Sequence, residues 1–224
     1  MTCIPINLVF EDSLSEAVLR RLLAGSRQKY TVGFHYNSRG YGSIKSKIDA
    51  FNHSAKGMPY MILTDLDVYP CPPALISAWL TTAKHPNLIF RIAVREVESW
   101  LLGCRPAFAR FLAIKEDLIP RDVDALPDAK RSLIDLVRKS PKKHLRSDIV
   151  PEAGSTARIG PDYNGQLIYF VENFWDPAIA KEHSTSLHRT IKALDEFRPI
   201  FETPPQGPSP SAAQSTSNPK GPFT

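Results

Sequence analysis

Short apolar runs alternate with amphipathic stretches along the first half of the chain. The runs are rich in β-branched and aromatic residues and are bounded by turn or capping residues, as buried strands usually are. The pattern predicts strands over residues 6–11, 30–36, 60–65 and 88–94. Strands that alternate with helices indicate βαβ units with right-handed crossovers, and therefore a parallel sheet.

Amphipathic helices are expected between these strands. Ser13 and Glu16 form a capping-box pattern, and an apolar stripe that includes Leu14, Val18 and Leu22 follows them. Further helices are expected from about Ser43 to Ala55, from Pro72 onward and from about Glu96 onward. We therefore expect an α/β fold, in which a Rossmann-like parallel sheet of about four strands is sandwiched between helices.

The alternation fades after Cys104, and the second half of the chain has a different organisation. Helices are expected over residues 106–114, 128–139, 166–174 and 184–197, with a basic loop over residues 138–146. This predicts an α/β domain over residues 1–104 and a helical accessory region over residues 105–202 packed on it. Residues 203–224 lack apolar periodicity and are rich in proline and serine, so we expect a disordered tail there.

Composition narrows the class of protein only a little. The formal net charge of +5 favours an anionic partner such as nucleic acid, although charge alone does not decide this. Three widely spaced cysteines without a CxxC pair fit reduced thiols in the cytoplasm. Since no segment reaches the roughly 20 uncharged apolar residues of a membrane-spanning helix, we expect a cytoplasmic protein with no membrane partner.

Acidic residues recur where the predicted strands end. Glu11 follows the first strand, Asp65 and Asp67 end the third, and Glu96 and Glu98 follow the fourth. Ligands of open parallel sheets bind at this edge, and carboxylates are oxygen ligands that Mg²⁺ prefers, with room here for one ion or two. Glu11 could instead lie simply in a loop before a helix, and Glu96 and Glu98 could complement a helix dipole. Glu98 is harder to explain that way, because it falls beside an apolar stripe where a charge needs a partner.

Three segments carry a resemblance to a known family. VFEDSLSEAVLRRLL, MILTDLD and IAVREVESWLLG resemble the Toprim fold of topoisomerases, primases and the overcoming-lysogenisation-defect nucleases, most closely its small, uncharacterised, defence-associated branch. The resemblance covers about residues 4–104. It implies that Glu11 acts as general acid/base and that Asp65 and Asp67 bind Mg²⁺ or Mn²⁺. It also implies a further acid, which is Glu98 or its close competitor Glu96.

The resemblance implies a function as well. It suggests a Toprim-like catalytic domain of a metal-dependent nuclease that cleaves DNA or RNA. By analogy, the protein would be the effector of a prokaryotic anti-phage defence system that works with a separate ATPase. Asp12 stands where many Toprim proteins have glycine, so either the turn is built differently or Asp12 joins the site. The later segments DALPDAKRSLIDLV and RIGPDYNGQLIYFVENFW are similar to the same branch but bring no established chemistry. Homo-oligomerisation stays open.

A basic run supplies candidate contacts to the phosphates of a nucleic acid, although a solvated charge run is the alternative. Its members are Arg138, Lys139, Lys142, Lys143 and Arg146. The six histidines show no zinc-ligand spacing, and no glycine-rich phosphate loop with lysine occurs.

Three other functions stay open. An apolar strand that ends in DxD also marks sugar-nucleotide transferases, although that function leaves Glu11 idle. A dehalogenase-like phosphatase also has DxD, but the motif usually opens the domain. The last alternative is a catalytically silent Toprim-like scaffold subunit.

Overall fold

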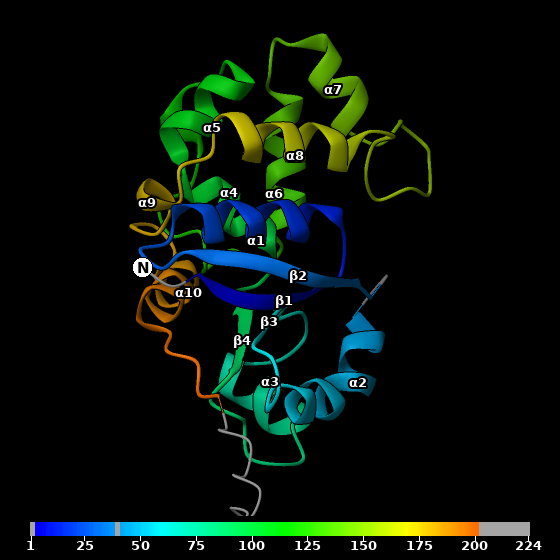
Figure 1. Cartoon of the computed structure of the whole chain (residues 1–224). Helices are drawn as coiled ribbons and strands as arrows, with labels where there is room; N and C mark the ends of the chain where they lie inside the picture. Colours follow the sequence, from blue (N-terminus) through cyan, green and yellow to red (C-terminus); the bar gives the residue numbers. More distant parts are fainter. Residues whose placement is uncertain (1–2, 39–40, 202–224) are drawn as a thin grey trace, which may run out of the picture.

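A four-stranded parallel sheet forms the centre of the computed structural model, which describes residues 3–38 and 41–201. The sheet order is β2-β1-β3-β4 (Figure 1). The strands are β1 (Ile4–Phe10), β2 (Tyr30–Asn37), β3 (Tyr60–Asp65) and β4 (Leu88–Ala93). The α/β class and the sandwiched parallel sheet predicted from the sequence are confirmed, and the arrangement is consistent with a Rossmann-like, Toprim-like fold.

Strand β1 lies inside the sheet and pairs with both β2 and β3. Leu8 is in register with Met61 of β3, and Ile6 is in register with Val32 of β2. Leu8 and Met61 are fully buried. Central strands read as nearly continuous apolar runs because helices cover both faces of the sheet.

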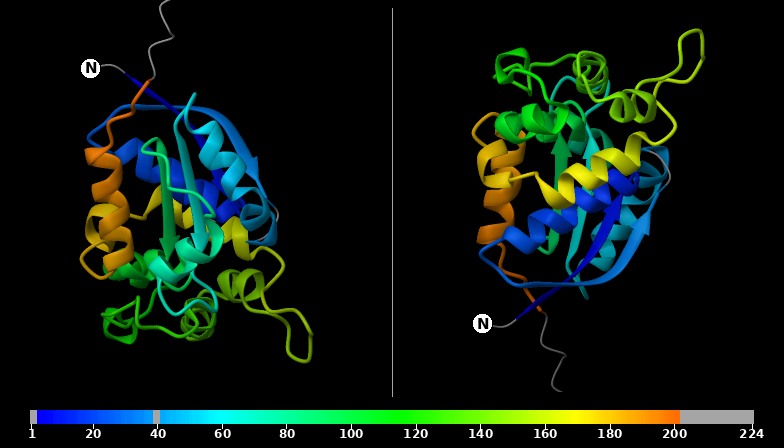
Figure 2. Two further views of the ribbon diagram at one scale, coloured as in Figure 1. Left: turned by 90° about the horizontal axis from the view of Figure 1, so that it is seen from below. Right: turned by 90° about the horizontal axis from the view of Figure 1, so that it is seen from above.

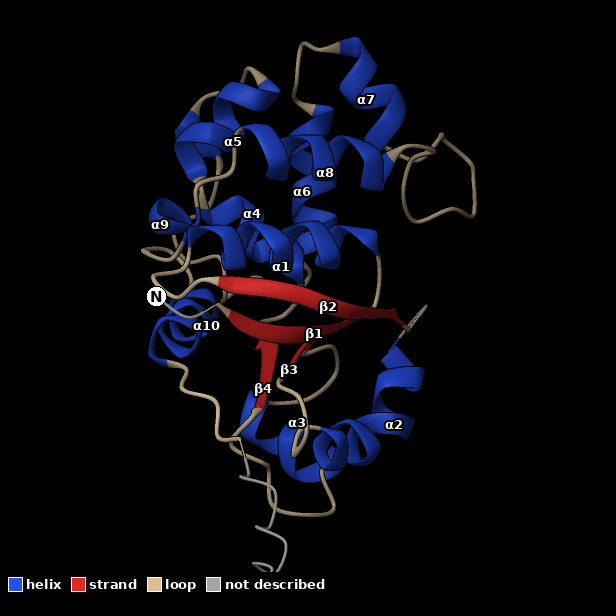
Figure 3. Cartoon of the chain, in the orientation of Figure 1, coloured by secondary structure: helices blue, strands red, loops and turns tan. Residues whose placement is uncertain are grey.

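Successive residues of β1 face opposite layers, as the pleat of a strand requires. Leu8 packs in an apolar cluster with Leu14 and Val18 of α1 (Ser13–Gly25). Val9 packs in a second cluster on the other face, which α2 (Tyr41–Ser54) and α3 (Pro72–Trp79) cover (Figures 1 and 3). The sheet is therefore the middle layer of three.

Helix α1 begins differently from the sequence prediction. The N-cap is Asp12, whose Oδ1 accepts a hydrogen bond of 2.8 Å from the backbone N–H of Ser15. The predicted pair of Ser13 and Glu16 is therefore not the capping pair. Asp12 therefore serves as the helix cap.

The second half of the chain adds helices to the α1 side of the sheet and to its β4 edge. Helix α8 lies alongside α1, and α10 lies beside β4 (Figure 2). The apolar cluster under α1 continues into this half through Phe108, Phe170 and Trp175. The elements are α4 (Val97–Gly103), α5 (Arg105–Leu112), η1 (Glu116–Leu118), α6 (Ala129–Arg138), α7 (Lys143–Ile149), α8 (Tyr163–Asn173), α9 (Pro177–Ala180) and α10 (Thr185–Glu196).

The predicted basic loop over residues 138–146 is wrong as a structural assignment. Arg138 ends α6, and Lys143 already begins α7. Leu145 and Ile149 are four residues apart and both buried, so the charged stretch contains one apolar helical face. The division of the chain at residue 104 stays a prediction, and the predicted tail over residues 203–224 lies outside the described residues.

None of the helices within residues 3–38 and 41–201 combines the length and apolar character needed to cross a membrane.

Candidate active site

The candidate site lies where the chain changes direction across the sheet. From β1 the chain moves to β2 on one side and then returns to β3 on the other, so β1 and β3 flank the topological switch point. Ligand sites of open α/β sheets lie beyond the carboxyl ends of the strands at this point. Glu11 follows β1 directly, and Asp65 is the last residue of β3.

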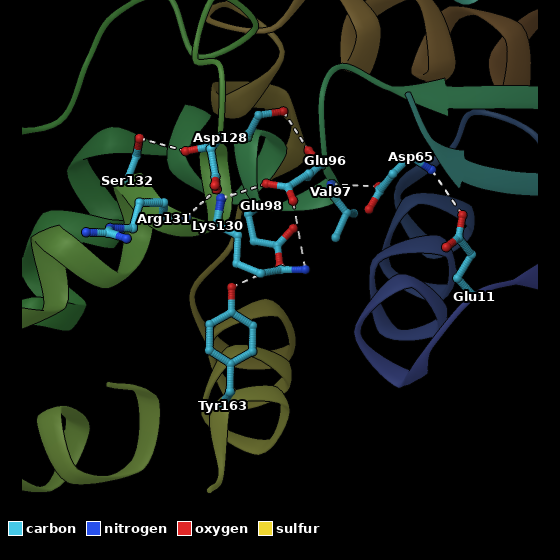
Figure 4. Close-up of polar contacts among 11 residues, drawn as sticks. Glu11, Asp65, Glu96, Val97, Glu98, Asp128, Lys130, Arg131, Ser132 and Tyr163 are labelled. Carbon is cyan, nitrogen blue, oxygen red and sulfur yellow. Dashed lines mark hydrogen bonds and ion pairs between the residues drawn. The ribbon is translucent and has the colours of Figure 1, made fainter. Parts of the chain in front are cut away.

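Glu11 is fixed against the end of β3. Its Oε1 accepts a hydrogen bond from the hydroxyl of Thr64. The same oxygen accepts a second, of 3.3 Å, from the backbone N–H of Asp65, which Figure 4 shows. Burial raises the pKa of Glu11, and the nearby charges of Asp67 and Asp12 raise it further, against the two hydrogen bonds. The structure therefore brings Glu11 and Asp65 together, as the sequence predicted.

Asp65 connects the ends of the strands to α4. Its Oδ1 accepts a hydrogen bond of 3.0 Å from the backbone N–H of Val97, the first residue of α4. Burial raises the pKa of Asp65 well above its usual range, and the charges of Glu98, Glu11 and Glu96 add to the effect. Since like charges raise a carboxyl pKa only at short range, these four acids form one electrostatic cluster.

Glu98 is the most deeply placed acid. It is 2% exposed, and its Oε1 accepts a hydrogen bond of 2.9 Å from the hydroxyl of Tyr163 and lies 3.4 Å from Lys130 Nζ (Figure 4). Burial raises the pKa of Glu98, and Lys130 opposes that shift. Its other oxygen, Oε2, is buried and has no hydrogen-bond partner in the part of the chain that the structure describes. One carboxylate oxygen at the base of the site is therefore left to accept a further donor or cation.

Glu96 is less buried than Glu98, and it also forms a hydrogen bond with the start of α6. Its Oε2 accepts a hydrogen bond of 2.7 Å from the backbone N–H of Lys130, and its Oε1 lies 4.0 Å from Lys130 Nζ. Asp128 caps the same helix by accepting a hydrogen bond of 2.6 Å from the backbone N–H of Arg131. Glu96 therefore supports the start of α6, and as the N-cap residue of α4 it also lies at the N-terminus of that helix, as the sequence-based alternative expected. Both Glu96 and Glu98 face the cluster, so the choice of ligand between them stays open.

Asp67 occupies the outer rim of the site. It is exposed and has a left-handed backbone with φ of 48°, and its carbonyl oxygen accepts a hydrogen bond of 3.1 Å from Arg95 Nη1. Desolvation raises the pKa of Asp67, and Lys130 opposes the shift. The charge of Asp67 also raises the pKa of Glu11. The DxD motif thus contributes one inner acid and one outer acid.

Lys130 and Tyr163 are the site residues that the sequence reasoning missed. Burial alone would lower the pKa of Lys130, but the charges of Glu98, Glu96 and Asp65 raise it. Burial and Glu98 raise the pKa of Tyr163, so its hydroxyl remains a hydrogen-bond donor. Both residues lie in the later segments that resembled the defence-associated branch. That likeness was the one signal for them, because neither belongs to a recognisable motif.

Members of the predicted basic run differ in how their side chains are used. Lys142 Nζ donates a hydrogen bond of 2.7 Å to the carbonyl oxygen of Phe111, and Arg146 donates to the carbonyl oxygen of Ser140. Lys139 and Lys143 are exposed. Arg138 lines a groove that also includes Glu96 and Lys130. Arg138 is thus the member of the run that reaches a cavity bordering the acidic cluster.

The donor chemistry of the cluster fits a hard divalent cation. The atoms that its acids offer to a metal ion are carboxylate oxygens, which Mg²⁺ prefers. The unpartnered Oε2 of Glu98 is one such oxygen in the interior of the site. Within residues 3–38 and 41–201, no group of three or more His, Cys, Asp or Glu side chains is already arranged around one point as metal ligands. Lys130 provides the positive charge among the inner acids in this structure.

Comparison with known proteins yields no relative: no protein-family model matches the chain. No curated protein matches it. No solved structure matches it either.

Proposed function

We propose that the chain is a metal-dependent nuclease that cleaves phosphodiester bonds in DNA or RNA. The observation that carries the proposal is the electrostatic cluster of Glu11, Asp65, Glu96 and Glu98 at the switch point of the sheet. Burial and the charges of Glu98, Glu11 and Glu96 raise the pKa of Asp65, and buried carboxylates held this close together are typical of functional sites. The Toprim resemblance of the same residues supports the proposal independently of the geometry.

The inner acids are the proposed metal-binding residues. Asp65, Asp67 and either Glu98 or Glu96 would hold Mg²⁺ or Mn²⁺, and Glu11 borders the same position. A bound divalent cation polarises a scissile phosphate and lowers the pKa of a water molecule. Asp65 is positioned for this role by the N–H of Val97, which fixes one of its carboxylate oxygens.

Glu11 is the proposed proton-transfer residue. Thr64 and the backbone of Asp65 hold its Oε1 in place, and within the described residues its Oε2 takes no hydrogen bond. The raised pKa of Glu11 makes exchange of a proton at Oε2 easier near neutral pH, which general acid/base catalysis needs. This use of Glu11 also favours the nuclease over a sugar-nucleotide transferase, in which Glu11 would have no role.

The cellular setting is proposed from the resemblance alone. The protein would act in the cytoplasm beside a separate ATPase that senses infection and releases the nuclease. A homo-oligomer would suit such an assembly.

A cleavage assay tests the proposal. End-labelled single-stranded and duplex DNA and RNA are incubated with the purified protein and Mg²⁺ or Mn²⁺, with EDTA as the blank. We expect cleavage that Glu11→Gln and Asp65→Asn each reduce by at least about a hundredfold, in the range seen for general acid–base groups. Asp117→Asn is the matched control, because Asp117 is exposed on η1. Hydrolysis of a sugar nucleotide with no cleavage of nucleic acid would contradict the proposal, and so would the absence of both activities.

A further inference from the structure

A basic groove opens directly beside the acidic cluster. It has a volume of about 610 Å³, and it lies between α6 and the segment over residues 151–159. Its cationic lining residues are Lys130, Arg131, Arg138 and Arg158, and its acidic ones are Glu96 and Asp128. Glu96 of the cluster lines the groove, and so does Lys130, which pairs with Glu98. A ligand bound in the groove would therefore lie next to the inner acids.

Four cationic side chains line the groove against two acidic ones, so its cations are in excess. Glu96 and Asp128 accept hydrogen bonds from the backbone at the start of α6. Two of the arginines share one carboxylate, that of Asp135. Arg131 Nε lies 3.5 Å from its Oδ2, and Arg138 Nη1 lies 2.5 Å from its Oδ1. Arg158 forms no ion pair with any described residue. Two arginines that share one acid, beside a third with none, make a surface that attracts anions.

The cations are spaced along the groove. Arg131, Ile134 and Arg138 follow at intervals of three and four residues, so they lie on one face of α6. Lys130 and Arg138 are eight residues apart, which corresponds to roughly 12 Å along a helix. Ile134 and Ile159 add apolar surface between the charges. A polyanion with apolar groups between its charges, such as a sugar-phosphate strand, matches this alternation better than a single small anion does.

The size of the groove separates a single strand from a duplex. A volume of about 610 Å³ is that of a small-molecule pocket. A duplex would not fit inside a groove of this size, because the major groove of a duplex is by itself about 12 Å wide. Arginine is suited to the contact, since its guanidinium can hold a phosphate with two hydrogen bonds.

We propose that this basic groove binds the backbone of single-stranded nucleic acid and directs it to the acidic cluster, with Arg131, Arg138 and Arg158 as phosphate contacts. The inference rests on the proposed function and specifies its substrate class and the path of the strand. Of the basic run suggested by the sequence, Arg138 lines the groove, whereas Lys142 and Arg146 are engaged with backbone carbonyls.

Fluorescence anisotropy with labelled oligo(dT) and oligo(U), in EDTA to prevent cleavage, tests the inference on the full chain. Arg138→Ala and Arg158→Ala should each weaken binding about three- to tenfold. Each should also reduce the slope of log K against log salt by about 0.7, the value expected for one lost phosphate contact on a single strand. Lys45→Ala removes an equal charge from α2, on the opposite face of the sheet, and should change neither quantity. Thermal melting of each variant checks that it folds.

The outcomes separate this inference from the proposed function. Groove-dependent binding by a protein that never cleaves would support the inference and defeat the nuclease proposal. Cleavage that is unaffected by Arg138→Ala and Arg158→Ala would defeat the inference and leave the nuclease proposal standing. The absence of binding to either oligonucleotide, or tighter binding of a matched duplex than of the single strand, also overturns the inference.

Discussion

Lys130 Nζ lies 3.4 Å from Glu98 Oε1, and this contact joins α6 to the buried start of α4. The Glu98 side chain is 3% exposed and that of Lys130 is 34% exposed, so the pair runs from the interior to the surface. An ion pair of this kind is held in place chiefly because separating it would leave a buried carboxylate alone. It therefore couples the packing of α6 to the charge of the candidate site.

Replacing Lys130 should destabilise the protein through Glu98. Lys130→Met removes the cation and leaves the carboxylate without its ion pair, which we expect to lower the free energy of unfolding by about 2–3 kcal/mol. This is somewhat less than for a fully buried pair. Glu98→Gln in the same chain should recover most of the loss, because it removes the uncompensated charge. Urea denaturation of the two single variants and the double variant measures the coupling. If the double variant loses as much stability as the two single variants combined, Lys130 and Glu98 are not coupled.

The hydroxyl of Tyr163 should contribute to stability by binding Glu98. Tyr163→Phe keeps the ring but removes the 2.9 Å hydrogen bond, so we expect a loss of about 1–2 kcal/mol. Tyr169→Phe on the same helix is the matched control, because Tyr169 is 52% exposed. The comparison uses thermal melting at one pH. Equal melting temperatures for the two variants would show that the Tyr163 hydroxyl contributes nothing.

Stability should fall as the pH rises from acidic to neutral. Burial, with the charges of Glu98 and Glu11, raises the pKa of Asp65 well above its ordinary 3.8, and burial raises that of Glu11 and of Glu98 as well. The folded protein therefore binds protons that the unfolded chain releases. The stabilising effect is complete below about pH 4 and is lost as the pH rises through the raised values.

Asp65→Asn should flatten this dependence. The amide oxygen can still accept the hydrogen bond from the backbone of Val97, but the carboxylate charge is gone. At neutral pH and in EDTA, we expect the variant to melt at a higher temperature than the unaltered protein, with a smaller difference near pH 4. For a domain of this size, a gain of 1 kcal/mol corresponds to roughly 2–4 °C. Parallel melting curves across the pH range would mean that Asp65 carries no electrostatic strain.

Much of the fold was predictable because its signals are local. The four strands and the helices that flank them follow from short apolar runs and from stripes at helical spacing, so their positions agree with the structure to within a few residues. Helix α7 was missed because its basic residues hid the pair Leu145 and Ile149. Asp12 caps α1 in place of Ser13, since both residue types are favoured at a helix start and they are adjacent in the sequence.

The candidate site was predictable only where the topology determines it. Residues that end parallel strands must meet at one edge of the sheet, and this brought Glu11 and Asp65 together in the prediction. Lys130 and Tyr163 reach Glu98 through the packing of α6 and α8, which no local pattern encodes. The proposed roles of Arg131 and Arg158 in the groove depend on the same packing. The basic run drew attention instead to neighbouring residues, of which Lys142 and Arg146 are engaged with backbone carbonyls.

The most direct test of the account is the binding of Mn²⁺, followed by electron paramagnetic resonance of the free ion at neutral pH. The unaltered protein should remove Mn²⁺ from solution, Asp65→Asn should weaken that binding at least tenfold, and Asp117→Asn should leave it unchanged. If the unaltered protein binds no Mn²⁺ at millimolar concentration, or if Asp65→Asn binds it equally well, the acids at the switch point do not form a metal site.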